Sequence, residues 1–357
     1  MNPGSRSLER FFRALPDRLP AARLTHVHLV HQDPSLPSPM AALRQHGFGG
    51  RVVAARASII RSLAPWPDMH WVLHDHPTAG QKGEHILLEL PQGKEAARLA
   101  IHLALEMVAP SGRLWVYGIR EHGIHSLGKK YPMAQVALLK GHMRLLSFDG
   151  GQEVTQSSTA DPFYRMDYKG LVLATLPGVF SWRKPDEGSL LLLEAMLDTD
   201  PGERVLDWGC GYGLLGVVMA RNWPQTRVVL ADDQFSAIRC ARETVRCNGL
   251  EERVSLVLED GIGSELSKLS FNTIVTNPPF HRGARNEHGV VASFFHRVAS
   301  VLKPKGWLWF VGNSFLEHGR TLQQCGFIVE KVIENNRFSV CRAQRAEASQ
   351  YRYRNTF

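Results

Sequence analysis

The tetrapeptide Asn277-Pro278-Pro279-Phe280 follows the apolar segment Phe271–Thr276 and joins an amide, two prolines and an aromatic ring. An exocyclic amino group on a base is a poor nucleophile because its lone pair is delocalised into the ring, so it needs hydrogen-bond acceptors that aim this lone pair. The Asn277 side-chain oxygen and the Pro278 carbonyl can supply two acceptors, and the prolines restrict the backbone that presents them. Phe280 offers a stacking face for a base. These four residues therefore predict a catalytic site that works by positioning a planar amino group, without a dedicated general base.

A glycine-rich motif lies upstream, Asp207-Trp-Gly-Cys-Gly-Tyr-Gly213, between an expected strand and an expected helix. Such a turn lets the backbone approach a ligand closely, and the helix N-terminus favours a carboxylate. Asp207 is expected to accept from an ammonium group, Asp232 from both hydroxyls of a ribose, and Asp260 from an adenine amino group. The residues expected to bind the cofactor are Asp207, Gly209, Cys210, Gly211, Gly213, Asp232, Asp233, Asp260, Gly261 and Asn277. The motif predicts a nucleoside cofactor with a methionine-like end, which is S-adenosylmethionine.

The same glycines also fit a dinucleotide-binding pattern, because Gly211, Gly213 and Gly216 satisfy Gly-x-Gly-x-x-Gly with an acidic residue about 20 positions further on. Two features favour the methyl donor over a dinucleotide. Asp207 stands just before the first glycine, where it would repel a pyrophosphate, and Asn277 with its neighbours has no role in hydride transfer.

Strands and helices alternate through the second half of the chain, which predicts a mostly parallel sheet with helices on both faces. The expected strands are Val205–Trp208, Arg227–Ala231, Val254–Leu258, Phe271–Thr276 and Leu308–Gly312, and the expected helices are Ser189–Leu197, Leu214–Asn222, Phe235–Asn248 and Val290–Leu302. Two closing strands, Phe327–Ile333 and Arg337–Ala343, predict an antiparallel hairpin at the end.

The first half looks like a degenerate copy of the same unit. Ser111–Gly118 lines up with Lys305–Gly312, and the strand His85–Leu90 stops at Pro91 where the second copy has its Asn277 tetrapeptide. We therefore predict an α/β protein with two tandem Rossmann-like class I methyltransferase domains. Residues 1–150 would form the degenerate domain with an RNA-binding or structural role, 151–168 the linker, and 169–357 the catalytic domain.

Composition narrows the partners. The 357 residues carry a formal net charge of +8, which favours a polyanion, and RNA is the natural candidate in a cytoplasm. No apolar run has the length of a membrane span, and a cytoplasmic monomer is expected. Of the 16 histidines, twelve lie before residue 150, including His26, His28 and His31, but no partner is spaced to complete a metal shell, so no metal is expected.

Residues 170–345 resemble the bacterial ribosomal RNA guanine-N2 methyltransferases of the small-subunit type, which have two methyltransferase-like domains, the first degenerate. The segments that carry this resemblance are Leu176–Ser181, Val205–Gly213, Asn277–His281 and Asn336–Val340. The resemblance implies N2-methylation of a guanosine in small-subunit ribosomal RNA, with Asn277 and Phe280 holding the guanine. It also suggests Phe180, Ser181 and His281 as substrate-binding residues.

Two alternatives stay open at this point. Related Asn-Pro-Pro-aromatic sites methylate adenine N6 or a glutamine amide, since both present a planar nitrogen, although His281 and the degenerate first domain favour guanine. A non-catalytic ribosome-assembly factor that binds RNA through a dead methyltransferase fold is the third hypothesis. The intact glycine motif and Asn277 argue against it.

Overall fold

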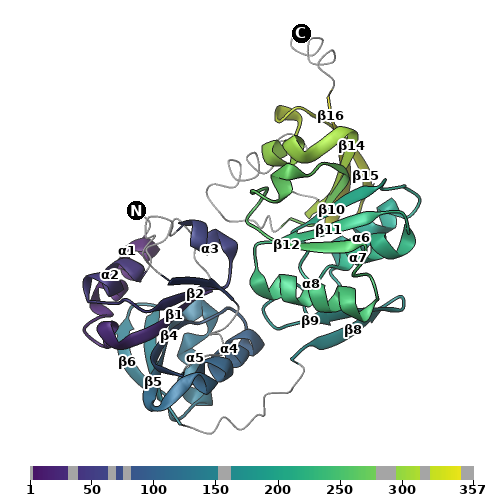
Figure 1. Ribbon diagram of the computed structural model, residues 1–357. Helices are drawn as coiled ribbons and strands as arrows, with labels where there is room; N and C mark the ends of the chain where they lie inside the picture. Colours follow the sequence, from purple (N-terminus) through teal and green to yellow (C-terminus); the bar gives the residue numbers. More distant parts are fainter. Residues whose placement is uncertain are drawn as a thin grey trace. The chain divides into compact units, whose positions relative to one another are not determined.

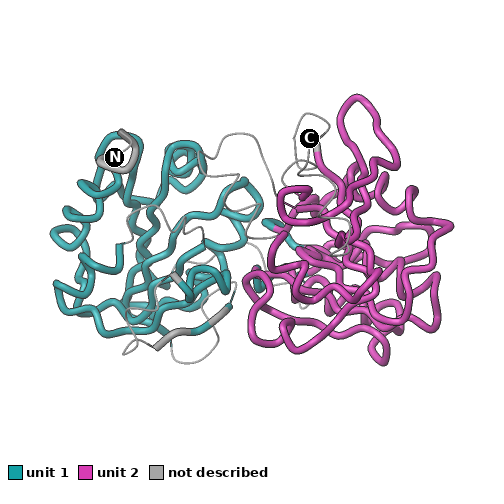
Figure 2. Tube along the Cα trace, turned by 90° about the horizontal axis from the view of Figure 1, so that it is seen from above, with its two compact units in different colours: residues 1–162, 176–178, 234–236 teal, residues 163–175, 179–233, 237–357 magenta. Residues whose placement is uncertain are grey.

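The computed structural model describes residues 3–30, 39–62, 70–74, 82–151, 162–278, 295–313 and 322–346. The chain divides into two compact units, coloured separately in Figure 2. Unit 1 comprises Met1–Pro162, Leu176–Gly178 and Gln234–Ser236, and unit 2 comprises Phe163–Thr175, Val179–Asp233 and Ala237–Phe357.

Unit 1 is built around a seven-stranded sheet of order β3-β2-β1-β4-β5-β7-β6 (Figure 1). The first five strands run parallel, and β7 pairs antiparallel with both β5 and β6. Its elements are α1 Pro3–Ala14, η1 Ala21–Arg23, β1 Leu24–Leu29, α2 Met40–Gln45, β2 Arg51–Ala54, α3 Ala57–Ser62, β3 His70–Leu73, β4 Gly83–Glu89, α4 Lys94–Glu106, β5 Val108–Ile119, η2 Arg120–His122, α5 Ile124–Lys130, β6 Gln135–Lys140 and β7 Met143–Asp149.

Unit 2 contains a second seven-stranded sheet, of order β12-β11-β10-β13-β14-β16-β15, and a separate β8–β9 hairpin. Its elements are β8 Tyr164–Tyr168, β9 Leu171–Thr175, α6 Glu187–Met196, β10 Arg204–Trp208, α7 Leu214–Asn222, β11 Arg227–Asp232, α8 Phe235–Cys247, β12 Val254–Leu258, η3 Leu266–Lys268, β13 Phe271–Thr276, β14 Leu302–Asn313, β15 Phe327–Glu334 and β16 Phe338–Arg345. Residues 295–301 are also helical, within the range expected for a helix.

The strand orders of the two sheets are the same when each strand of unit 1 is matched to the strand nine places later in unit 2. The expected α/β fold with tandem, mostly parallel sheets and an antiparallel C-terminal hairpin is confirmed. The sequence did not predict the matching hairpin of unit 1, β6 with β7. Parallel neighbours require crossover connections, which the helices between the strands supply.

Two segments that contain proline and glycine are part of strands. Pro110–Gly112 lies inside β5 and Lys303–Gly306 lies inside β14, which begins six residues before the expected strand Leu308–Gly312. Both strands shift register at this point, and both glycines approach a neighbouring backbone closely. A Cβ on Gly112 would lie 2.1 Å from the Glu84 carbonyl oxygen, and a Cβ on Gly306 would lie 2.9 Å from that of Asn272. The prolines and glycines of these two segments therefore mark a β-bulge in each strand.

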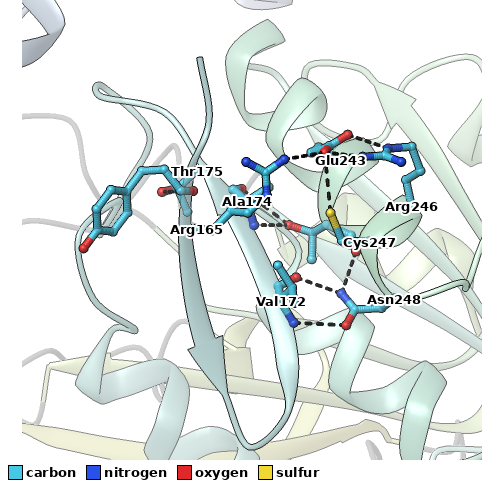
Figure 3. A network of polar contacts seen from close by, with 10 residues as sticks. Arg165, Val172, Ala174, Thr175, Glu243, Arg246, Cys247 and Asn248 are labelled. Atoms are coloured by element: carbon cyan, nitrogen blue, oxygen red, sulfur yellow. Dashed lines mark hydrogen bonds and ion pairs between the residues drawn. The ribbon is translucent and has the colours of Figure 1, made fainter. Parts of the chain in front are cut away.

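The β8–β9 hairpin begins within 151–168, the range expected for the linker, and its β9 strand is bonded to helix α8 (Figure 3). Asn248 accepts from the Val172 backbone N–H at 3.0 Å and donates to the Val172 carbonyl at 2.8 Å. One helical turn earlier, the Thr244 hydroxyl accepts from the Ala174 N–H at 2.9 Å. These side chains satisfy backbone groups of β9 as a neighbouring strand would, and β9 leads toward the segment that carries Asp186.

Candidate functional site

The carboxyl ends of four adjacent strands of unit 2 meet along one edge of the sheet. In the order of the sheet these ends are Leu258 of β12, Asp232 of β11, Trp208 of β10 and Thr276 of β13. The pairing aligns them, with Asp232 opposite Leu258, and the Thr276 hydroxyl donates to the Trp208 carbonyl at 2.7 Å. Open α/β sheets bind ligands outside this edge, where the strand order reverses. Most of the candidate site residues predicted from sequence lie at the ends of these strands or shortly after them, while Phe180 and Ser181 lie between β9 and α6.

The glycine loop after β10 is attached to β11. The backbone N–H groups of Gly209 and Cys210 both donate to the Ala231 carbonyl, at 2.8 and 3.0 Å. Gly209 and Gly211 have φ angles of 71° and 56°, in the left-handed region that favours glycine. A Cβ at either position would meet no heavy atom within 4 Å, so within the described residues the space above the loop is open. The loop thus offers exposed backbone to a ligand at the start of α7.

Asp207 is fully buried below this loop. One of its carboxylate oxygens, Oδ2, accepts from the Gly216 backbone N–H at 2.8 Å, which satisfies a free N–H in the first turn of α7. The other, Oδ1, is buried without a hydrogen-bond partner among the described residues. Burial raises the pKa of Asp207 to about 7, against the opposing effect of the Gly216 hydrogen bond. A buried acceptor with an unused oxygen is suited to an ammonium group, whose charge would lower this pKa again.

Asp232 connects the loop to β11, because its Oδ2 accepts from the Gly211 backbone N–H at 2.9 Å. Three further predicted residues lie at the same edge and are half-buried. Asp233 follows β11, and Asp260 and Gly261 follow β12. A Cβ on Gly261, whose φ is 76°, would lie 3.3 Å from the Arg297 guanidinium. The predicted cofactor-binding residues therefore lie along one edge of the sheet. Asp232 is bonded directly to the glycine loop, and Asp207 is bonded to α7, the helix that follows the loop.

Asn277 follows β13 at this edge, and its side chain is held from one side. Its amide nitrogen Nδ2 donates to Asp186 Oδ2 at 2.7 Å and to the Ser189 hydroxyl at 2.9 Å. Pro278 is buried directly after it. Asp186 is the N-cap of α6 and accepts from the Ser189 backbone N–H at 2.9 Å. Helix α6 begins at Glu187 rather than at the expected Ser189, because Asp186 caps it.

The segment between β9 and α6 carries the predicted substrate-binding residues Phe180 and Ser181. Phe180 is an exposed aromatic ring with 54% of its surface accessible. Ser181 adopts a left-handed backbone conformation with φ 50°, which non-glycine residues rarely take and which costs roughly 1–3 kcal/mol. An exposed ring beside a strained backbone is typical of a ligand-binding segment.

The structure also adds residues that the sequence did not indicate, namely Asp186, Ser189 and Tyr212. Tyr212 is buried, and burial together with the charge of Asp186 raises the pKa of its phenol. The signal available was Asp186 as a helix N-cap just before an apolar run, but its partner Asn277 lies 91 positions away. Pro279, Phe280 and His281, predicted to act beside Asn277, lie outside the described residues.

No cluster of three or more metal-binding side chains occurs among the residues that the structure describes. His26 and His28 lie in β1 and are buried there. In the same parts of the chain, no helix is both long and apolar enough to cross a membrane.

The doubly wound sheet, with its glycine loop and its acidic and amide residues at one edge, is that of a methyltransferase domain. Residues 170–342 match the family model of the methyltransferase small domain. The whole chain is also similar in fold to a solved structure described as the T. thermophilus 16S rRNA N2 G1207 methyltransferase (RsmC) in complex with AdoMet and guanosine. The TM-score is 0.79 at 22% identity, over 97% of this chain and 95% of that one.

Two relatives extend the match beyond the methyltransferase domain, and both are named ribosomal RNA small subunit methyltransferase C. The protein of Pseudomonas syringae pv. tomato is 31% identical over 74% of this chain and 80% of its own length. That of Hahella chejuensis is 28% identical over 85% of this chain and 90% of its own length. The chain belongs to the ribosomal RNA small subunit methyltransferase C family, which confirms the expected enzyme class and the resemblance seen in the sequence.

Proposed function

We propose that the chain transfers a methyl group from S-adenosylmethionine to the exocyclic N2 amino group of a guanosine in small-subunit ribosomal RNA. The observation that carries this proposal is the side chain of Asn277, whose amide nitrogen is bonded to Asp186 and Ser189 so that its oxygen is left for the acceptor. Membership of the family and the fold shared with the guanosine complex support the same reaction.

The cofactor would be held by the edge of the sheet that runs from β12 to β10. Asp207 Oδ1 would accept from the methionine ammonium, the backbone of the Gly209–Gly213 loop would lie along the cofactor, and Asp232 would accept from the ribose hydroxyls. Among the described residues, the buried Asp207 Oδ1 has no hydrogen-bond partner and the space above Gly209 and Gly211 is open, which fits such a ligand. S-adenosylmethionine supplies an activated methyl group on a sulfonium, a strong leaving group, so the protein has mainly to position the acceptor.

The acceptor would be held by Asn277, Pro278, Pro279 and Phe280. The Asn277 oxygen and the Pro278 carbonyl would each accept one N–H of the amino group, leaving its lone pair directed at the methyl group. Phe280 would stack on the base, with Phe180, Ser181 and His281 beside it. Adenine N6 and a glutamine amide also present a planar nitrogen and remain outcomes of the assay below.

Unit 1 would contribute binding rather than chemistry. A cavity of about 590 Å³ lies in this unit at the start of α4 and beside α5. Three of the side chains that line it are basic, Lys94, Arg98 and Lys130, against one carboxylate, Glu121. This charge suits RNA phosphates, whose contacts dominate nucleic-acid affinity. We therefore assign residues 1–150 an RNA-binding role and 169–357 catalysis, in a cytoplasmic monomer that acts on small-subunit RNA.

The role of unit 1 is testable with two neighbouring lysines of α5. Lys130 lines the cavity and Lys129 does not, while both are exposed. Lys130→Glu should weaken binding of a small-subunit RNA fragment more than Lys129→Glu, and should lower the salt dependence of binding by about one phosphate contact. Equal effects of the two variants would show that the cavity is not the contact.

The reaction itself is tested with purified protein, radiolabelled S-adenosylmethionine, and either free small-subunit RNA or assembled subunits from a strain lacking the gene. Modified nucleosides are identified by mass after digestion. N2-methylguanosine is the expected product. Label on adenine or on protein would overturn the acceptor, and cofactor binding without any label on either substrate would favour the non-catalytic assembly factor.

A further inference from the structure

The side chain of Asn277 is held by two groups of the first turn of α6. Its Nδ2 lies 2.7 Å from Asp186 Oδ2 and 2.9 Å from the Ser189 hydroxyl, both within hydrogen-bond distance. These two contacts use both N–H groups of the amide. All three residues belong to unit 2, and the two holding residues are themselves bonded, since Asp186 accepts from the Ser189 backbone N–H.

The direction of the Asn277 amide follows from the chemistry of its partner. An amide can present either an oxygen or an NH2 group, and turning it by 180° exchanges an acceptor for a donor. A carboxylate only accepts, so Asp186 can bond only the NH2 end. Asn277 Oδ1 is thereby left facing away from α6, where it can accept from an incoming amino group.

We infer that Asp186, assisted by Ser189, is a positioning residue that fixes Asn277 with its oxygen toward the acceptor. The inference rests on the proposed function, because it concerns the group that Asn277 receives. The same orientation would also discriminate between bases. Asn277 Oδ1 is a hydrogen-bond acceptor, so the site favours a base that presents an amino group. A base with a carbonyl oxygen at the same place is disfavoured, because two acceptors would then face each other.

The holding residues are fixed in turn by their surroundings. Gly188, between them in sequence, is closely packed. A Cβ there would lie 3.1 Å from Asp186 Oδ2 and 3.2 Å from the Phe338 ring at the start of β16. On another side, Tyr212 of the glycine loop is close enough to Asp186 for the carboxylate charge to raise the pKa of its phenol. Asp186 thus connects the cofactor loop, α6 and the acceptor residue.

Asp186→Asn tests the inference with little effect on the fold. Asparagine caps a helix about as well as aspartate, so α6 should persist. An asparagine at this position can donate to Asn277 Oδ1, which would allow the Asn277 amide to turn its NH2 toward the acceptor. The expected result is a fall in kcat of roughly 10- to 100-fold with unchanged affinity for S-adenosylmethionine. Ser189→Ala, which removes the weaker contact, should lower kcat only about two- to fivefold.

Glu187→Gln is the matched control. It makes the same chemical change one residue further along α6, at a carboxylate whose described partners are Lys184 and Arg337 rather than Asn277. Its kcat should stay that of the unmodified protein. If Asp186→Asn keeps full kcat, or if it loses cofactor affinity and melting temperature along with kcat, Asp186 is not a positioning residue.

A second measurement is independent of activity. The side-chain NH2 of Asn277 can be followed by ¹⁵N NMR and assigned by its absence in Asn277→Asp. In the unmodified protein its two protons should exchange slowly with water, and in Asp186→Asn their shifts and exchange should change. An unchanged signal overturns the inference. Absence of methyl transfer to guanosine by the unmodified protein would instead overturn the proposed function, while the NMR result would still decide whether Asp186 orients the amide.

Discussion

The two sheets share one strand order but differ at the edge where the site forms. The paired registers make the units comparable residue by residue. Ile86 of β4 pairs with Leu114 of β5, two residues after the close-packed Gly112, and Ile274 of β13 pairs with Leu308 of β14, two residues after Gly306. Three residues beyond Ile86 and Ile274, unit 1 has Glu89 where unit 2 has Asn277.

Glu89 and Asn277, which occupy corresponding positions in the two units, differ in what they bond. Glu89 Oε2 accepts from the Val30 backbone N–H at 2.7 Å, so this side chain bonds back to the end of β1. By the same register Val27 of β1 corresponds to Asp207 of β10, so unit 1 also lacks the buried carboxylate. The same topology is thus compatible with a candidate ligand edge in unit 2 and, in unit 1, with an edge where the corresponding side chain bonds back to the backbone. The fold supplies the place and the side chains supply the chemistry.

The two units should differ most in the effect on kcat when the corresponding side chains, Asn277 and Glu89, are each replaced by alanine. Asn277→Ala removes the side-chain oxygen that we propose accepts a hydrogen bond from the substrate amino group, and should lower kcat roughly 10²- to 10³-fold or more, with cofactor affinity retained. Glu89→Ala should leave kcat within about twofold while lowering the stability of unit 1 by about 1–3 kcal/mol, because Val30 loses its partner. Single-turnover methyl transfer and thermal melting would separate the two effects. A loss of catalysis in Glu89→Ala would show that unit 1 takes part in the reaction.

Glycines in the helices of the two units should respond with opposite sign to the same substitution. A Cβ on Gly216 of α7 would lie 2.2 Å from Leu230 and 2.9 Å from Val228, so Gly216→Ala should destabilise unit 2 by about 1–3 kcal/mol. Gly128 of α5 has nothing within 4 Å of such an atom among the described residues, and Gly128→Ala should stabilise unit 1 by about 0.5–1 kcal/mol. Chemical unfolding measures both. Equal signs would mean that close packing of α7 on the sheet does not require glycine.

The fold was largely predictable because its signals are local. Alternating apolar strands and helices predicted the parallel sheets, and the repeat around Gly112 and Gly306 predicted that the first half copies the second. The position of Asn277 and of the glycine loop at strand ends was predictable for the same reason. Strands β6 to β9 are among those not predicted, since short strands are decided by the partner against which they pack.

The less predictable part of the site depends on contacts between distant residues. Asp186 is recognisable in sequence as a helix cap, but its bond to Asn277 spans 91 positions and follows only from the folded chain. Asp207 accepts from the Gly216 N–H in the first turn of α7, only nine positions further on, but the sequence indicated it as a ligand-binding carboxylate alone. In both cases one side chain serves a helix terminus and the site together.

The affinity for the cofactor should depend on pH through Asp207. The corresponding residue of unit 1 is Val27, which has no titratable group. The raised pKa of about 7 means that the carboxyl is largely protonated below this pH in the free protein. An ammonium ligand favours the ionised form, so affinity for S-adenosylmethionine should rise as the pH is raised toward about 7, with a proton released on binding. Asp207→Asn should weaken binding roughly tenfold or more and abolish this release. Calorimetry in two buffers of different ionisation enthalpy measures the proton. Release that persists in Asp207→Asn would assign it to another group.

The smallest effect is expected at the β8–β9 hairpin, which belongs to neither shared sheet. Asn248→Ala removes both bonds to Val172 and should lower the stability of unit 2 by about 1–2 kcal/mol.

Glu243→Gln should lower the stability of unit 2 by less than Asn248→Ala does, and only at pH values where Glu243 is ionised. Hydrogen bonds from Arg246 lower the pKa of Glu243 to about 2, so its contribution is present above the usual value of 4.5 and is lost as the pH falls toward 2. Because the Arg246 side chain is largely exposed to solvent, the contribution should be below about 1 kcal/mol at neutral pH. Urea unfolding of both variants at neutral and acid pH would show it. A Glu243→Gln effect that grows as the pH falls would have the wrong sign for this ion pair and would require another role for Glu243 on α8.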